Sequence, residues 1–258
     1  SAMTLTKKLT KSEFRQRADK ILMCLSLEVT PFWADSEEKA KQRIERAAGD
    51  PLYFCRTYLP HYFAHGPAPF HHDLVRMLEQ RDNEVVTPMA VAAPREFAKT
   101  TVCAFGYVLH QICFRRRHFI LIGSDTEDLA SDLTGYIYLE LLYNERLHQD
   151  FGELVKGNKP VNDFVTLNDI RVKARGRGQR LRGLKHKQWR PDLVILDDLE
   201  NDSNVRNPEI VQSILDWVKS AVYPAVDARG TLMIIGTILR WHSALHVMLT
   251  SLDEPYCH

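Results

Sequence analysis

The first side chains in this sequence that could take part in chemistry are a lysine and a neighbouring hydroxyl residue. Both follow an apolar run. Lys99 and Thr100 come after the run at residues 89–93. Ala93 and Ala98 stand at the two glycine positions of a Gly-x-x-x-x-Gly-Lys-Ser/Thr pattern. In such a loop, backbone N–H groups surround phosphates, the lysine reaches the β and γ oxygens, and the hydroxyl binds Mg²⁺. The spacing therefore predicts a degenerate phosphate-binding loop of the Walker A type.

The two alanines are where this loop departs from the pattern. Alanine tolerates positive φ poorly, so the loop must either avoid that conformation or carry strain. Taken alone, residues 98–101 are equally compatible with the start of an amphipathic helix after a strand. A second site is needed to decide between the two interpretations.

A second candidate site follows the apolar run at residues 193–196, which ends in Asp197 and Asp198. Enzymes with a phosphate loop use acids in this position to hold Mg²⁺ and to orient an attacking water. We expect Asp197 to bind Mg²⁺, mostly through water, and a neighbouring acid to act as the base. Position favours Asp198 as that base, whereas Glu200 has the longer reach, so both stay open. A strand that simply ends in a solvated acidic turn is the plainer alternative.

The elements that must position these residues alternate between apolar runs of strand length and helical stretches, which predicts a mostly parallel sheet. In such a sheet the ligand crevice lies at the carboxyl ends of the strands, so the loop and the acids should meet there. Ser124 and Glu127 have the spacing of a capping box. Strands are predicted at residues 89–93, 119–123, 193–196 and 232–235, and helices at 99–114 and from 124 to about 147.

Helical patterns also precede the first strand, at residues 13–27 and 36–48, with Gly49 placed to end the second. Asp50 and Pro51 are typical of a cap and a first helical residue. We expect a helical extension over residues 1–65, packed on a core over residues 66–258. Further predictions are a helix at 70–80, a helix capped by Asn207 that reaches about 220, and a hairpin or mobile loop made by 164–167 and 170–172 around Asn168 and Asp169.

Composition sets the broad class of this chain of 258 residues, of which 45% are hydrophobic and 26% charged. These values are typical of a soluble globular protein with one large domain. We expect no membrane segment and a cytosolic location, because apolar runs approaching about 18 residues and a secretion signal are absent. The five cysteines are odd in number and lack two-residue spacings, which argues against a disulfide framework and a zinc site.

The order of the two sites resembles that in the large terminases of tailed bacteriophages. Residues 94–101 are similar to the arginine-containing variant Walker A motif of that family, with Arg95 as its mark. Residues 180–184 and 190–201 resemble the run into the terminase Walker B strand, and residues 232–237 resemble the coupling motif that ends in Gly-Thr. Residues 69–74 resemble the segment that contacts adenine. The resemblance covers about residues 69–240, and it implies a P-loop NTPase of the RecA-like, additional-strand class, with a mostly parallel central sheet flanked by helices.

The resemblance also implies roles for single residues. Thr237 would sense the γ-phosphate, and His71 is the candidate for adenine, although a histidine in an amphipathic helix is more often structural. Asp198 stands where the family usually has glutamate. The implied catalytic residues are Lys99, Asp198, Glu200, Arg95 and Arg182. The implied nucleotide contacts are Pro94, Arg95, Glu96, Phe97, Ala98, Lys99, Thr100, Thr101, His71 and Thr237, and the metal ligands are Thr100 and Asp197.

The function that follows from the resemblance is a motor that hydrolyses ATP with Mg²⁺ and drives double-stranded viral DNA into a capsid, in the host-cell cytoplasm. Its expected partners are a portal protein, a small terminase subunit and further copies in a ring, although the chain alone could be a monomer. Only 21 residues follow Thr237, so we expect the ATPase domain without the family's carboxyl-terminal nuclease, and no DNA cleavage. A helicase-like motor and a nucleotide-binding assembly module without turnover are the alternatives.

Basic residues gather before the acidic strand. Residues 171–190 contain nine lysines or arginines and no acid, and residues 115–117 form a shorter arginine cluster. Such runs contact DNA phosphates or a neighbouring subunit's ATP, unless they are solvated loops. Arg182 is the leading candidate for the second role and Arg180 the next, while Arg95 could act on the γ-phosphate of its own chain. Trp189 could stack on a partner, but packing is the commoner role.

Overall fold

The computed structural model describes residues 19–20, 22–23, 25, 27–33, 35–64, 66–79, 87–94, 98–157 and 160–250. Its described part is built around one six-stranded sheet with the order β1-β6-β5-β2-β4-β3. All neighbouring strands run parallel except β3, which pairs antiparallel with β4. The strands are β1 (Thr87–Ala92), β2 (Phe119–Ser124), β3 (Asp163–Val165), β4 (Arg171–Gly176), β5 (Leu193–Asp197) and β6 (Thr231–Gly236).

The strand register brings the carboxyl ends of four strands to one edge of the sheet. Ala92 of β1 pairs with Gly236 of β6, and Asp197 of β5 pairs with Ile235 of β6. On the other side of β5, Ser124 of β2 pairs with Asp197. The segments that leave β1, β5 and β6 therefore start side by side at this edge.

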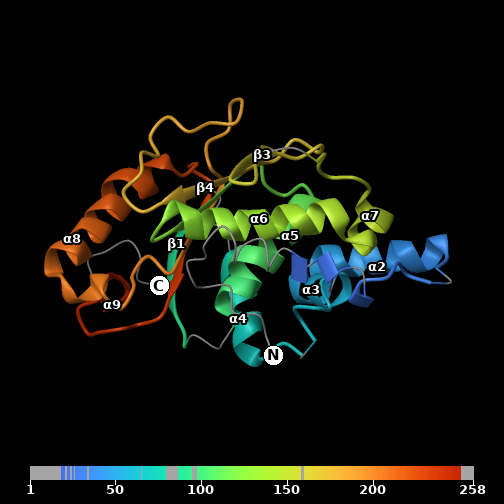
Figure 1. Cartoon of the computed structure of the whole chain (residues 1–258), viewed down its shortest axis with the longest axis horizontal. Coiled ribbons are helices and arrows are strands. Elements are labelled where there is room, and N and C mark those ends of the chain that lie inside the picture. Colours follow the sequence, from blue (N-terminus) through green and yellow to red (C-terminus); the bar gives the residue numbers. More distant parts are fainter. Residues whose placement is uncertain are drawn as a thin grey trace.

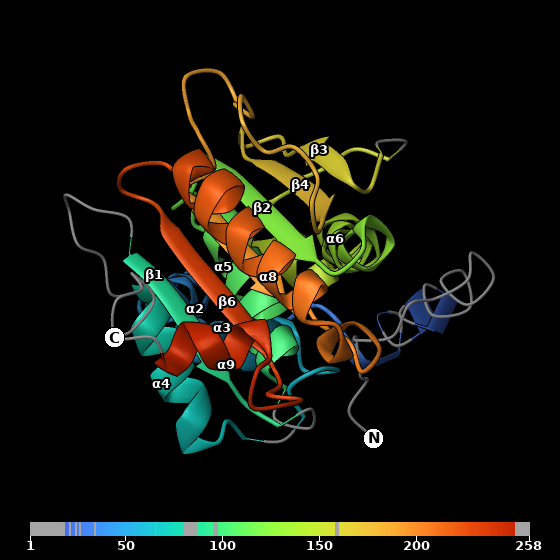
Figure 2. The same cartoon turned by 90° about the vertical axis from the view of Figure 1, so that its left-hand side faces the viewer.

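Helices cover both faces of the sheet, and the strands are apolar on both sides for that reason. Along β5, Ile195 belongs to the hydrophobic cluster of one face, whereas Val194 and Leu196 belong to that of the other. Figure 1 shows α2, α3 and α4 on the opposite side of the sheet from α8 and α9, and Figure 2 shows α8 and α9 in front of the strands. The first face carries α2 (Glu37–Gly49), α3 (Pro51–Tyr58), α4 (Pro69–Glu79), η1 (Thr100–Gly106), α5 (Tyr107–Cys113), α6 (Glu127–Tyr143) and α7 (Glu145–Phe151); the second carries α8 (Pro208–Trp217), η3 (Val218–Val222) and α9 (Ala244–Thr250).

The apolar runs predicted as strands are strands in the structure, and several predicted caps are confirmed. Asp50 accepts hydrogen bonds from the backbone of Leu52 and Tyr53 at the start of α3, and Asn207 caps α8. The hairpin is confirmed as well, with Val165 of β3 opposite Arg171 of β4. The predicted helix at residues 13–27 extends outside the described residues.

Two predictions about the helix after β2 are wrong. Its cap is Thr126, whose hydroxyl accepts from the backbone of Leu129, whereas Ser124 is the last residue of β2. The helix does not reach residue 147 either. Asn144 ends α6 and caps α7 by accepting from the next turn's backbone, because its short amide competes with a continuing helix.

The predicted helix after the phosphate loop is not a uniform α-helix. Its first part, η1, is a π-helix of seven residues, and α5 continues from it. Gly106 is the last residue of η1 and lies against α3. A larger residue would not fit there, because a Cβ at this position would lie 2.5 Å from Cys55 Sγ. Short π-helical segments often mark functional sites.

The front helices share the core of the sheet. Phe54 and Tyr58 of α3 are buried in the same hydrophobic cluster as Ile195. The division into residues 1–65 and 66–258 stays a prediction. Cys55 and Cys103 are buried free thiols and Cys113 is partly exposed, while Cys24 and Cys257 lie outside the described residues. Within the part of the chain that the structure describes, no helix is long and apolar enough to cross a membrane.

Candidate functional site

Side chains from three strand ends converge on the ammonium group of Lys99. This lysine is 2% exposed. Its Nζ donates to Thr237 Oγ1 at 3.1 Å and lies 3.7 Å from Asp198 Oδ1. The Thr237 hydroxyl in turn donates to the carbonyl of Ala93 at 3.2 Å. The residues predicted from the phosphate loop, the acidic strand and the Gly-Thr strand are therefore in contact.

A second pair lies beside the first. The Thr100 hydroxyl donates to Asp197 Oδ1 at 3.0 Å, and both residues are buried. Burial raises the pKa of Asp197 and the charge of Asp198 raises it further, whereas the Thr100 hydrogen bond and Lys99 lower it. A buried carboxylate beside a second acid favours a nearby cation. Carboxylate and hydroxyl oxygens are the ligands that Mg²⁺ prefers, so these residues fit that ion.

The backbone of the predicted phosphate loop carries strain at one of its two alanines and avoids it at the other. Ala98 has a φ of +51°, in the left-handed region, and Ala93 does not share it. The strained residue, Ala98, directly precedes Lys99, and strained backbone is common at functional sites. The predicted contacts Arg95, Glu96 and Phe97 lie outside the described residues. Pro94 is exposed, while Thr101 is half-buried on η1.

Replacing Ala98 with glycine should stabilise the protein. An L-residue in the left-handed region costs about 1–2 kcal/mol, and the extra freedom of unfolded glycine offsets about 0.5–1 kcal/mol of that gain. We therefore expect Ala98→Gly to raise the free energy of unfolding by roughly 0.5–1 kcal/mol in urea titrations. Ala93→Gly is the matched control and should lower it by a similar amount. A loss of stability in Ala98→Gly would contradict the strain.

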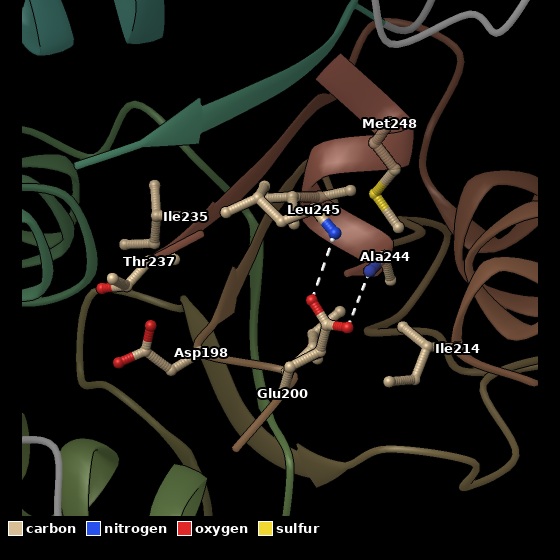
Figure 3. A pocket seen from close by; sticks show the side chains of 11 residues that line it. Asp198, Glu200, Ile214, Ile235, Thr237, Ala244, Leu245 and Met248 are labelled. Carbon is tan, nitrogen blue, oxygen red and sulfur yellow. Dashed lines mark hydrogen bonds between the residues drawn. The ribbon is translucent and has the colours of Figure 1, made fainter. Parts of the chain in front are cut away.

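The two candidate bases face different partners. Asp198 lies beside Lys99, as described above, with a φ of +42° at the turn after β5. Glu200 instead accepts hydrogen bonds from the backbone N–H groups of Ala244 at 2.7 Å and Leu245 at 3.2 Å. Figure 3 shows its carboxylate directed at α9, with Asp198 and Thr237 on the other side of the pocket. Burial raises the pKa of Glu200.

The contact of Glu200 with α9 has no signature in the sequence, because its partners are backbone groups. The pocket between this contact and Asp198 is mostly apolar. Its lining includes Ile214 of α8, Ile235 of β6 and Met248 of α9. Asp198 and Thr237 contribute polar atoms at one side, so the pocket adjoins the Lys99 cluster.

His71 takes part in the turn before α4. Its Nδ1 accepts from the backbone N–H of Ala68 at 3.1 Å, and its backbone N–H donates to the carbonyl of Ala68. The backbone of Ala68 is therefore a hydrogen-bond partner for Nδ1, and no bound ligand is needed to explain the position of that nitrogen. The assignment of His71 to adenine stays a prediction.

Most of the basic run before β5 is paired within the fold. Arg182 is exposed, and its guanidinium donates to the carbonyl of Ser220 at 3.2 Å. It does not join the Lys99 cluster of its own chain. Within the described ranges, four exposed basic residues of the run have no carboxylate partner: Arg180, Arg182, Lys185 and Arg190. The paired ones are Arg171 and Lys173 with Asp163, Arg175 with Glu127, Arg177 with Asp125, and Lys187 with Asp169.

The shorter arginine cluster is partly internal, with only Arg115 of its three residues exposed, so contact of this cluster with DNA stays a prediction. Arg117 is 2% exposed and donates to the carbonyl of Asp192 at 2.5 Å and to Thr231 Oγ1 at 3.0 Å. Arg116 pairs with Glu79 on α4. Trp189 stacks on His118 with ring centroids 3.7 Å apart. Its role is packing.

Comparison with known proteins adds a likeness of fold. No protein-family model matches the chain, and no curated protein matches it. Among solved structures, it is similar to the crystal structure of the HK97 bacteriophage large terminase, with a TM-score of 0.51 and 16% sequence identity. The match covers 82% of this chain and 43% of that one, so the chain spans less than half the length of the terminase. The two proteins share a large terminase-like fold over the matched part.

Proposed function

We propose that this chain is the ATPase part of a large terminase, a P-loop NTPase that hydrolyses ATP with Mg²⁺ to move double-stranded viral DNA into a capsid. The observation that carries the proposal is the meeting of Lys99, Asp198 and Thr237 at one sheet edge. Three motifs that are far apart in the sequence supply these side chains. The likeness of fold to the HK97 large terminase supports the same conclusion.

The strand order supports a place in the additional-strand class of RecA-like NTPases. One strand, β6, separates β1 from the acidic strand β5. It is hydrogen-bonded to both neighbours, and Thr237 follows its last residue. A change in the contact between Thr237 and the γ-phosphate could therefore move β6, which is bonded to both β1 and β5.

Each residue of the cluster has a distinct task in this proposal. Lys99 binds the β and γ oxygens, and its charge stabilises the transition state. Thr100 and Asp197 would hold Mg²⁺, which neutralises charge on the phosphates. Asp198 orients the attacking water and accepts its proton. Thr237 releases Lys99 to the nucleotide and contacts the γ-phosphate.

The partners follow from the motor role. We infer that copies of the chain form a ring around DNA with a portal protein and a small terminase subunit, in the host cytoplasm. Arg182 lies at the surface, where a residue that acts on a neighbour's ATP must lie. Arg180, Lys185 and Arg190 share this exposed loop and suit DNA phosphates.

Removing the unpaired arginines should weaken DNA binding in a salt-dependent way. Each phosphate contact contributes about 0.9 to the slope of log affinity against log salt. We therefore expect Arg180→Ala with Arg190→Ala to lower that slope by about 2, as measured by fluorescence anisotropy with duplex DNA. Arg171→Ala is the control, because Arg171 is paired with Asp163. An unchanged slope would contradict the proposed contact between this loop and DNA.

The direct test of the function is Mg²⁺-dependent release of phosphate from ATP by the purified chain, with and without duplex DNA. Release that chelation of Mg²⁺ abolishes supports the proposal. Tight ATP binding without release would instead support an assembly module. Strand separation by the chain alone would favour a helicase-like motor.

A further inference from the structure

The six-residue loop 238–243, between β6 and α9, carries an exposed aromatic and basic surface. Trp241 is 84% exposed and Ile238 is 44% exposed. Arg240 and His242 are exposed as well. A tryptophan this open to water is unusual, because aromatic side chains bury a large apolar area when they can.

Both ends of this loop are fixed to the candidate site. Thr237, directly before it, accepts from Lys99 at 3.1 Å. Ala244 and Leu245, directly after it, donate to Glu200. Figure 3 shows the bonds between Glu200 and α9, with Thr237 on the other side of the pocket. Glu200 therefore acts as a positioning residue, which holds the loop in a set place relative to Lys99.

The indole itself is also held in place. His246 of α9 packs against Trp241 with ring centroids 5.3 Å apart and an angle of 88° between the rings. This edge-to-face contact orients the indole and leaves most of its surface in water. A ring that is oriented beforehand loses little entropy when a planar ligand stacks on it.

The loop leaves β6 beside Lys99, and the helix after it is held at Glu200, two residues beyond Asp198. After β6 the chain turns towards β1, an edge strand, and α9 packs against it. Asp197 and Asp198 follow β5, on the other side of β6. The loop therefore joins the end of β6, next to Lys99, to a helix that contacts both Glu200 and the edge strand β1.

The loop is also short enough to keep Trp241 within the length of a nucleotide from Thr237. Trp241 is four residues beyond Thr237, so its Cα lies within about 14 Å of the threonine. The base of a nucleoside triphosphate is a ribose and three phosphates away from its terminal phosphate, which is a comparable length.

We propose that Trp241 is the platform on which the adenine base of the bound nucleotide stacks, with Arg240 beside it. This proposal rests on the proposed function of the site. It gives adenine an exposed π-face, whereas His71 uses Nδ1 within its own turn. Stacking discriminates weakly between bases, because every base has a π-face. Selection of ATP over GTP should therefore be modest.

The test compares a nucleotide with the same phosphates without a base. Affinities of a non-hydrolysable ATP analogue and of inorganic tripolyphosphate, both with Mg²⁺, are measured by calorimetry. We expect Trp241→Ala to weaken the analogue about ten-fold and to leave tripolyphosphate unchanged. Trp241→Phe should restore most of the affinity, since phenylalanine keeps a stacking face. Trp33→Ala is the matched control, because Trp33 is 81% exposed and belongs to the front end of the chain.

The outcomes separate this inference from the function. Equal weakening of both ligands in Trp241→Ala, or no weakening of either, overturns the adenine platform. Weakened duplex-DNA binding with unchanged analogue binding also overturns it and assigns the loop to DNA. If the wild-type protein binds neither ligand, the proposed function fails first, and the inference fails with it.

Discussion

Replacement of Lys99 by alanine is expected to lower ATP turnover by about 10³-fold, the size of effect seen when one preorganised charge on a transferring phosphoryl group is lost. The ammonium is buried and contacts Thr237 and Asp198, so no solvent-exposed lysine can replace it. Nucleotide affinity should fall as well, because the lysine contacts the ground-state phosphates. The measurement is steady-state phosphate release, with calorimetry for binding.

Folding must be separated from chemistry in this experiment. Lys99→Ala leaves Asp197 and Asp198 without a neighbouring cation, which costs stability. Lys99→Arg keeps the charge but changes its geometry, so it should fold and still lose most of the activity. Lys39→Ala, on the exposed side of α2, should behave as wild type. A Lys99→Ala protein that is folded and keeps its ATPase rate would end the proposed function.

Substitution of the two candidate bases should give opposite results. Asp198→Asn keeps the shape of the side chain but removes the proton acceptor, so turnover should fall by about 10²- to 10⁴-fold. Glu200→Gln keeps one acceptor oxygen for the N-terminus of α9, so turnover should stay within about three-fold, with a loss of about 1 kcal/mol of stability.

The reverse pattern would move the base to Glu200. In that case the contact with Ala244 and Leu245 would have to open during the reaction. Thermal unfolding of both variants is the control, because a structural role for Glu200 predicts a lower melting temperature with normal turnover. A Glu200→Ala variant should lose more stability than Glu200→Gln, since it removes both acceptor oxygens.

The strands and the meeting of the three motifs could be predicted from the sequence, because both depend on strong local signals. A buried strand leaves a continuous apolar run, and in a parallel sheet the carboxyl ends share one edge. Lys99, Asp197 and Thr237 follow directly from that rule. Asp50 and Asn207 were predictable for a similar reason, since a cap depends on a few adjacent residues.

Other features depend on contacts that one sequence does not encode locally. Arg117 looks like surface charge in the sequence, yet it bonds groups on β6 and before β5. The acids that pair with the basic run stand outside it, so its composition overstated its charge. Glu200 could not be assigned because its partners are backbone N–H groups, which every residue except proline provides.

The π-helix η1 has a mechanical consequence. A π turn holds more residues than an α turn, so η1 is shorter and wider than an α-helix of the same seven residues. Tightening η1 into α-helical turns would lengthen it and push Thr100 towards the strand ends. Gly106 lies closely against Cys55 at one end of η1, and Thr100 is hydrogen-bonded to Asp197 at the other. The π-helical form of η1 therefore sets how far Thr100 lies from α5 along this segment.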